Sequence, residues 1–287
     1  MAQMHEMKLE KTRQVGHQGD HARRHLFTSL KQHVSHLEMG GNTAQLSCDL
    51  PELDHALSGG VRAGYPHLIC GHPHDGAATG FVLALLAKMA RQNPEAIFIW
   101  CAAPFAGLQG QLSARGIAAC GLSPAHFIFI DEQHPMQLMA AYEQALQTKS
   151  VTAVIAEYGV MYQKPELWQR WIRRFRRAAR TSGAFGLLLG ADAPIAGLET
   201  KWHIASHPYQ QMPASSPTSS PSLSPSLSQG DEWPSIWDVH LVSARAGRPY
   251  RDMLVWDRIS HKFRHSPVPH IYQPVAHLAL SAQPVSA

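Results

Sequence analysis

The sequence predicts an α/β fold: a mostly parallel sheet with helices on both faces and an antiparallel hairpin that extends it towards the C-terminus. Apolar runs of strand length alternate with segments of helical period between residues 66 and 189, the pattern of parallel strands joined by helical crossovers. The runs are nearly continuous in apolar residues, as in strands covered on both faces. Two later strand-like runs flank a Gly/Pro turn, which predicts the hairpin.

The individual elements follow from these patterns. Apolar runs predict strands at residues 66–71, 96–101, 126–131, 151–156 and 184–189. Segments with apolar residues at i, i+3 and i+4 predict helices at residues 77–92, 107–117, 135–148 and 165–182. Later strands are predicted at residues 201–206, 237–244 and 251–257, the last two joined by the turn from Ala246 to Pro249.

The chain is predicted to form a single domain over residues 26–258, which opens with a short amphipathic helix. Residues 1–25 are polar and without apolar period, and they predict a disordered tail. Residues 212–231 are rich in Ser and Pro. Too few apolar residues lie there to offset the entropy of ordering, so a disordered insertion is predicted. Residues 259–287 contain several prolines and are predicted to be a loose C-terminal tail.

Composition narrows the class of protein. The net charge of the 287 residues is +4, which mildly favours a nucleic acid or an acidic protein as a partner. The four cysteines show no paired spacing, so free thiols in a reducing compartment are expected. No apolar run approaches the ~20 residues that span a bilayer, and residues 1–10 contain no secretory apolar stretch. We therefore expect a cytoplasmic protein without membrane contact.

The 19 histidines raise the question of a metal. Cys70, His72 and His74 alternate in one loop, and helical spacing is shared by His17, His21 and His25. Zinc sites generally combine two well-spaced pairs of ligands, and no second pair stands out. The sequence alone therefore predicts neither a metal site nor a cofactor.

The segment from Gly71 to Gly80 has the position of a phosphate-binding loop. Such a loop has the pattern G-x-x-x-x-G-K-[ST] and lies between a buried strand and a helix. Gly71 and Gly76 have the required spacing, but Ala77 replaces the lysine that reaches the phosphates and Ala78 replaces the hydroxyl that holds Mg²⁺. These residues predict a vestigial P-loop.

Other residues weaken the case for catalysis further. Thr79 offers a hydroxyl one position late, and Asp75 would repel a phosphate group. Glu157 ends a predicted strand, either as a vestigial metal or water ligand or as a carboxylate that caps a helix or faces water. Residues 100–105 contain no carboxylate to activate a water molecule. We expect no ATP hydrolysis and weak or absent nucleotide binding, with some ATP affinity restored by Ala77→Lys and Ala78→Thr together.

Several segments resemble known families. The segment from Leu50 to Val61 resembles the lead-in to the nucleotide loop of RecA-like ATPases. The altered loop and helix start, Gly76 to Leu86, is similar to that of the alphaproteobacterial ImuA family, as is Val154 to Gly159. The C-terminal segments that share this resemblance are Thr200 to Ala205, Trp237 to Leu241, Gly247 to Pro249 and Leu254 to Asp257. The resemblance covers roughly residues 26–258.

The resemblance implies a RecA-like P-loop core and a role in damage-induced mutagenesis. It implies a non-catalytic accessory protein of SOS-induced, error-prone translesion DNA synthesis and repair. The implied partners are ImuB, an error-prone C-family DNA polymerase and RecA itself.

The predicted helix at residues 165–182 carries a dense basic surface. Its apolar stripe runs through Leu167, Trp168, Trp171, Ile172, Phe175 and Ala179. Away from the stripe lie six arginines, with no acidic residue interleaved: Arg170, Arg173, Arg174, Arg176, Arg177 and Arg180. Two interpretations stay open, a contact with single-stranded DNA or an acidic partner, and a solvated outer face whose long stems cover apolar surface.

Two alternative functions also stay open. The first is a divergent RecA-family, DNA-dependent ATPase that uses a displaced lysine such as Lys88 or Lys201. Lys88 lies about three helical turns along the predicted helix, too far to reach the loop. The second is a regulator of RecA filaments or of cell division that does not contact a polymerase.

Overall fold

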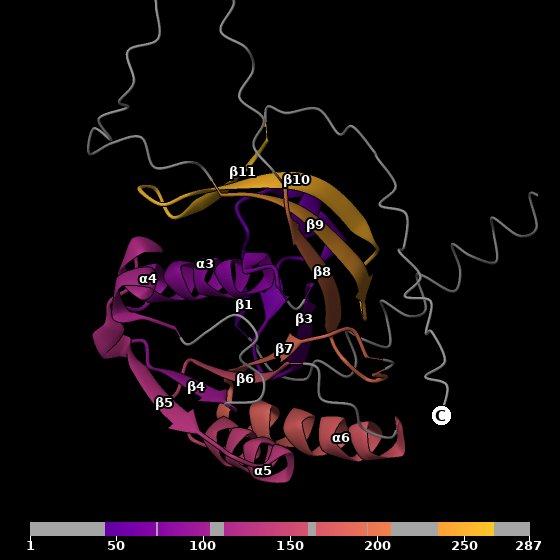
Figure 1. Cartoon of the computed structure of the whole chain (residues 1–287). Coiled ribbons are helices and arrows are strands. Elements are labelled where there is room, and N and C mark those ends of the chain that lie inside the picture. The colour runs from indigo at the N-terminus through magenta and orange to yellow at the C-terminus, as the bar shows by residue number, and fades with distance from the viewer. Residues whose placement is uncertain are drawn as a thin grey trace, which may run out of the picture.

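A nine-stranded sheet forms the centre of the computed structural model, which describes residues 44–72, 74–103, 112–159, 165–193, 195–207 and 235–266. The strand order is β11-β10-β9-β8-β3-β7-β6-β4-β5 (Figure 1). Six neighbouring strands run parallel: β3 (Pro66–Cys70), β4 (Phe98–Ala102), β5 (Phe127–Asp131), β6 (Ala153–Gly159), β7 (Phe185–Gly190) and β8 (Thr200–Ser206). Three antiparallel strands complete the sheet: β9 (Ser235–Ala244), β10 (Tyr250–Asp257) and β11 (Lys262–His265).

Helices cover both faces of the sheet, as predicted (Figure 1). On one face lie α2 (Pro51–Ala56), α3 (Ala77–Gln92) and α4 (Ala114–Ala119). On the other lie α5 (Pro135–Leu146) and α6 (Pro165–Ser182). A hydrophobic cluster lies on each face of the sheet, and strand β3 contributes to both. Ile69 belongs to the cluster under α3, while Leu68 and Cys70 belong to the cluster under α5 and α6. This alternation is why a nearly continuous apolar run was the right signal for a central strand.

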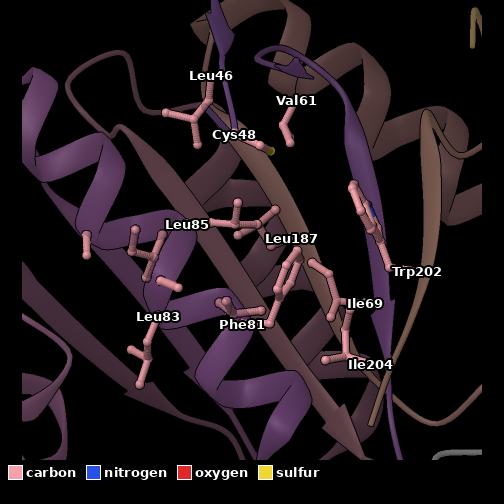
Figure 2. Close-up of a cluster of buried hydrophobic side chains, with 14 of the residues drawn as sticks. Leu46, Cys48, Val61, Ile69, Phe81, Leu83, Leu85, Leu187, Trp202 and Ile204 are labelled. Carbon is pink, nitrogen blue, oxygen red and sulfur yellow. The ribbon is translucent and has the colours of Figure 1, made fainter. Parts of the chain in front are cut away.

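Helix α3 is buried on almost every side. Figure 2 shows Phe81 and Leu85 of α3 facing Ile69, Leu187 and Trp202 of the sheet. The last strands of the sheet also reach the helix, since the Phe81 ring lies 5.4 Å from the Phe263 ring of β11. Residue 80 of α3 is glycine because a Cβ there would lie 3.0 Å from the Trp237 ring of β9. The antiparallel extension is therefore part of the domain core.

The structure corrects the predicted C-terminal boundary. Residues 259–287 were predicted to be loose, but Lys262–His265 form β11 and pair with residues 254–257 of β10. Phe263 is buried in the core. Residues 267–287 lie outside the described residues, as do the predicted tail at 1–25, the predicted helix at 26–37 and the predicted insertion at 212–231.

Most predicted elements lie within a few residues of the observed ones, with two differences in detail. The helix predicted at residues 107–117 is observed as α4 from Ala114, and residues 104–111 are outside the described part. Strand β5 was predicted to be covered on both faces, but it is an edge strand on which Ile128 and Phe129 are 51% and 46% exposed. Short elements that were not predicted are β1 (Gln45–Leu46), β2 (Val61–Arg62) and the 3₁₀ turn η1 (Pro124–His126).

A buried polar network joins the amino ends of β3 and β8. His67 is fully buried, and its Nε2 lies 2.8 Å from the Arg62 carbonyl oxygen, to which it must donate. Its Nδ1 therefore accepts from the Thr200 hydroxyl at 2.8 Å, while the Trp202 indole donates to Thr200 Oγ1 at 2.7 Å. Arg62 also pairs with buried Glu199 at 2.9 Å.

Among the described residues, no helix is both long and apolar enough to cross a membrane.

Candidate functional site at the carboxyl end of strand β3

Gly71, the first residue of the loop between β3 and α3, packs tightly against its neighbours. A Cβ at Gly71 would lie 2.9 Å from the Ala78 Cβ and 2.9 Å from the Ile204 carbonyl oxygen, so a larger residue would force the helix or β8 aside. Ala77 and Ala78 are buried, and Thr79 is half-buried in the first turn of α3. The predicted loop residues are therefore together at the carboxyl end of a central strand, where ligands bind in open α/β sheets.

Asp75 occupies the amino end of α3. Its Oδ1 accepts a hydrogen bond from the Ala77 N–H at 2.9 Å, and its Oδ2 accepts from the Ser206 N–H at 2.6 Å. The Ser206 hydroxyl donates to the same carboxylate. Since the amino end of a helix attracts an anion, this carboxylate fills the position in which a bound phosphate would be favoured. The loop thus carries its own anion.

Glu157 has a different neighbour from those expected. Its Oε2 accepts a hydrogen bond from the Trp100 indole N–H at 2.9 Å. Burial raises the pKa of the Glu157 carboxyl, and the Trp100 hydrogen bond partly opposes that shift. Strand β7 lies between β6, which carries Glu157, and β3. The Glu157 carboxylate thus bonds to an indole on β4 and not to a helix end. It is also separated from the β3–α3 loop by strand β7.

The two lysines considered as displaced catalytic groups are both ion-paired. Lys88 is buried on α3 and pairs with Asp49. Lys201 of β8 pairs with Asp192 and also donates to the Ala193 carbonyl oxygen at 3.4 Å. Either lysine would have to leave a carboxylate to reach a phosphate.

A cluster that the sequence did not predict lies at the same edge of the sheet. Ligand atoms of Cys70, Asp192 and His203 all lie within 4.8 Å of one another. His203 Nε2 is 3.0 Å from Asp192 Oδ2. Cys70 is far from the other two residues in the sequence, and only the pairing of β3 with β8 reveals that Cys70 and His203 are neighbours.

Helix α6 has the predicted apolar stripe, but its arginines differ from one another. Arg174 forms a two-point ion pair with Glu143 of α5, at 2.9 and 2.6 Å. Arg176 and Arg180 lie over the Tyr65 ring, at 5.3 and 5.6 Å from its centroid. The expectation of six arginines without a counter-charge is therefore wrong for Arg174, whose acidic partner comes from another helix.

The three arginines that carry no such contact among the described residues lie on one stripe of α6. Arg170, Arg173 and Arg177 are exposed, and their spacing of three and four residues places them on one helical face. We call these three residues the arginine stripe.

The chain matches no protein-family model, and the search of curated proteins finds no match to it.

Proposed function

We propose that this chain is a non-catalytic, RecA-like accessory protein of SOS-induced, error-prone translesion DNA synthesis, in which it acts as an adaptor with ImuB and an error-prone C-family DNA polymerase. The observation that carries the proposal is Asp75 at the amino end of α3. With Ala77 and Ala78 beside it, the loop has the glycine spacing of a P-loop, while its own carboxylate lies at the amino end of α3, where an anion is favoured.

The placement of the resembling segments supports the same proposal. The lead-in from Leu50 to Val61 contains α2 and packs into the core through Leu53 and Ala56. The altered loop opens α3, and the segment from Val154 to Gly159 lies in β6. The C-terminal segments lie in β8, β9 and β10 and in the turn before β10. The segment that resembles RecA-like ATPases thus contains α2, and the segments similar to ImuA lie in the sheet, in α3 and in one connecting turn.

The alternative function, a divergent ATPase, is disfavoured because the charged groups that it would need already have partners in the fold. A working site needs a cation at the phosphates and an acid that activates water. Lys88 and Lys201 are held by Asp49 and Asp192, and Glu157 is held by Trp100. A catalytic role would require these contacts to break. It would also require the Asp75 carboxylate to move away from the amino end of α3.

Purified full-length protein tests the proposal in two assays. We expect no ATP turnover, with or without single-stranded DNA, and we expect capture of purified ImuB. DNA-stimulated turnover would overturn the non-catalytic assignment and favour the ATPase. Capture of RecA without ImuB or polymerase would overturn the adaptor role and favour a regulator of RecA filaments.

A further inference from the structure

We propose that Cys70, Asp192 and His203 form a binding site for a divalent transition-metal ion, with Zn²⁺ the best match. The site goes beyond the proposed function and does not depend on it. The cluster spans three adjacent strands, at the carboxyl ends of β3 and β7 and beside the middle of β8. Cys70 is the last residue of β3 and pairs with His203 of β8, while Asp192 follows β7 by two residues.

Strand pairing fixes this arrangement more firmly than a loop would. Cys70 pairs in register with His203 on one side and with Gly190 on the other. Gly190 itself packs closely, since a Cβ there would lie 2.6 Å from the Gly159 carbonyl oxygen. The chain turns directly from Gly190 to Asp192, and the Ala191 N–H donates to that same carbonyl at 2.6 Å. Two of the three ligands are on strands, and the third is within two residues of one.

The distances suit a small tetrahedral ion. Zinc bonds of about 2.3 Å to sulfur and about 2.0–2.2 Å to nitrogen and oxygen place tetrahedral ligand atoms roughly 3.4 Å apart. The three ligand atoms here lie within 4.8 Å of one another, so shifts of about 1 Å bring them onto one ion.

The ligand types decide between ions. A thiolate with an imidazole is a soft donor set that selects zinc and its neighbours, whereas Mg²⁺ and Ca²⁺ take oxygen ligands. The cysteine loses its proton when the metal binds. Three protein ligands would leave a fourth position for water or another group.

Lys201 holds the Asp192 carboxylate in position through an ion pair. Its ammonium group pairs with Asp192 Oδ1, while His203 lies against the other oxygen, Oδ2. A metal ion that replaces the His203 hydrogen bond would therefore find the carboxylate already oriented. Outer partners of this kind typically change metal affinity by about 10- to 100-fold.

The test is a Zn²⁺ titration of metal-free, full-length protein, followed by the same titration with Co²⁺ and absorption spectroscopy. We expect a thiolate-to-cobalt charge-transfer band in the near ultraviolet, and a rise in thermal stability with Zn²⁺. Cys70→Ser should abolish the band and weaken zinc binding by at least ~10-fold. Asp192→Asn and His203→Gln should each weaken binding comparably.

Cys101→Ser is the matched control, because Cys101 is also buried near the carboxyl end of a strand of the sheet, β4, and lies outside the cluster. It should bind Zn²⁺ and Co²⁺ as the unaltered protein does. Wild-type protein without the charge-transfer band would overturn the proposal. So would a band or a zinc affinity that survives in Cys70→Ser, because the metal would then be held elsewhere in this histidine-rich chain.

Discussion

Asp75 decides the chemistry of the β3–α3 loop through a charge that the P-loop pattern does not contain. Its carboxylate accepts hydrogen bonds from Ala77, two residues further along the chain, and from Ser206, 131 residues further along. An added phosphate group would have to displace these bonds and also approach a negative charge. We therefore expect the loop to disfavour phosphate even before the missing lysine is considered.

Restoring the missing side chains alone should not restore nucleotide binding. The sequence suggested that Ala77→Lys with Ala78→Thr would recover ATP affinity, but Asp75 would pair with the new lysine and keep the anion position filled. We expect the further change Asp75→Ser to tighten ATP binding by at least ~10-fold over the double variant, since a charged hydrogen bond contributes about 1.5–3 kcal/mol. Calorimetric titration with ATP measures both variants.

Thermal unfolding must be measured alongside, because Ala78 is buried against Gly71 and a threonine there adds bulk. Equal ATP affinity in the folded double and triple variants would contradict the role given to Asp75.

His67 makes the stability of the fold depend on pH. Burial lowers the pKa of His67 below its ordinary value. The unfolded chain therefore binds a proton below about pH 6.5 that the folded chain does not. The free energy of unfolding should fall by up to ~1.4 kcal/mol per pH unit as the pH drops from about 6.5 towards the folded-state pKa.

The variant His67→Gln isolates this effect. A glutamine amide can donate to the Arg62 carbonyl oxygen and accept from Thr200, but it does not titrate. Urea unfolding at several pH values should give a shallower acid slope for the variant. If the free energy of unfolding changed equally with pH in the two proteins, His67 would not be the cause of the pH dependence.

Among single residues, the sequence was most informative where the pattern is local. Gly71, Gly76, Ala77 and Ala78 are consecutive or nearly so, and their chemistry follows from a short loop. The cluster of Cys70, Asp192 and His203 and the hydrogen bond between Asp75 and Ser206 could not be predicted in this way. Both depend on which strands lie beside β3, and the sequence does not state the strand order.

Helix α6 carries apolar side chains on one face and arginines on another. Trp168, Trp171 and Phe175 are buried against the sheet and α5, as the predicted apolar stripe requires. The arginine stripe faces outward, whereas Arg174 is paired with Glu143. A contact to DNA or to an acidic partner is therefore expected to use the stripe and not the paired arginine.

Neighbouring arginines provide a matched test. Arg173→Gln should weaken binding to single-stranded DNA and reduce the salt dependence of that binding by about one charge. Arg174→Gln removes the same charge from a residue already paired on its own protein, so its effect on DNA affinity should be much smaller. Fluorescence anisotropy at several salt concentrations measures both.

Equal effects of the two variants would contradict the distinction between stripe and pair. No effect of either variant, on DNA or on ImuB capture, would mean that the stripe is a solvated outer face.

Strand β11 illustrates where patterns of apolar residues fail. It has four residues, and only Phe263 is buried, so no periodic signal distinguishes it from a tail. The longer central strands were predicted because both of their faces meet helices. Strand β5 was the exception: its apolar run suggested a covered strand, yet it lies at the sheet edge.

Removing the Phe263 ring should destabilise the whole domain. The ring lies 5.4 Å from Phe81 and 5.0 Å from Trp256, so Phe263→Ala would leave a cavity between α3 and the sheet. We expect a loss of about 3–5 kcal/mol in the free energy of unfolding. Ile259→Ala is the control, because Ile259 is 98% exposed in the same predicted tail and should change stability little.

Urea unfolding distinguishes the outcomes for the two variants. A Phe263→Ala protein as stable as the unaltered one would contradict the assignment of β11 to the domain core.

At the scale of the whole molecule, the sheet, the loop and α6 support one account. The nine-stranded sheet curls so that its last strands contact α3 on the face opposite α5 and α6. The carboxyl end of β3, where a nucleotide would bind in such a fold, is filled by the protein's own carboxylate. This carboxylate is the observation from which we propose an adaptor and not an ATPase.

The most direct test of that account is the frequency of ultraviolet-induced mutation, measured with survival, in a strain that lacks this protein. The account predicts that induced mutagenesis is lost while survival falls only modestly, and that the full-length protein restores both. Induced mutagenesis at the normal frequency in the strain without the protein would contradict the role in translesion synthesis.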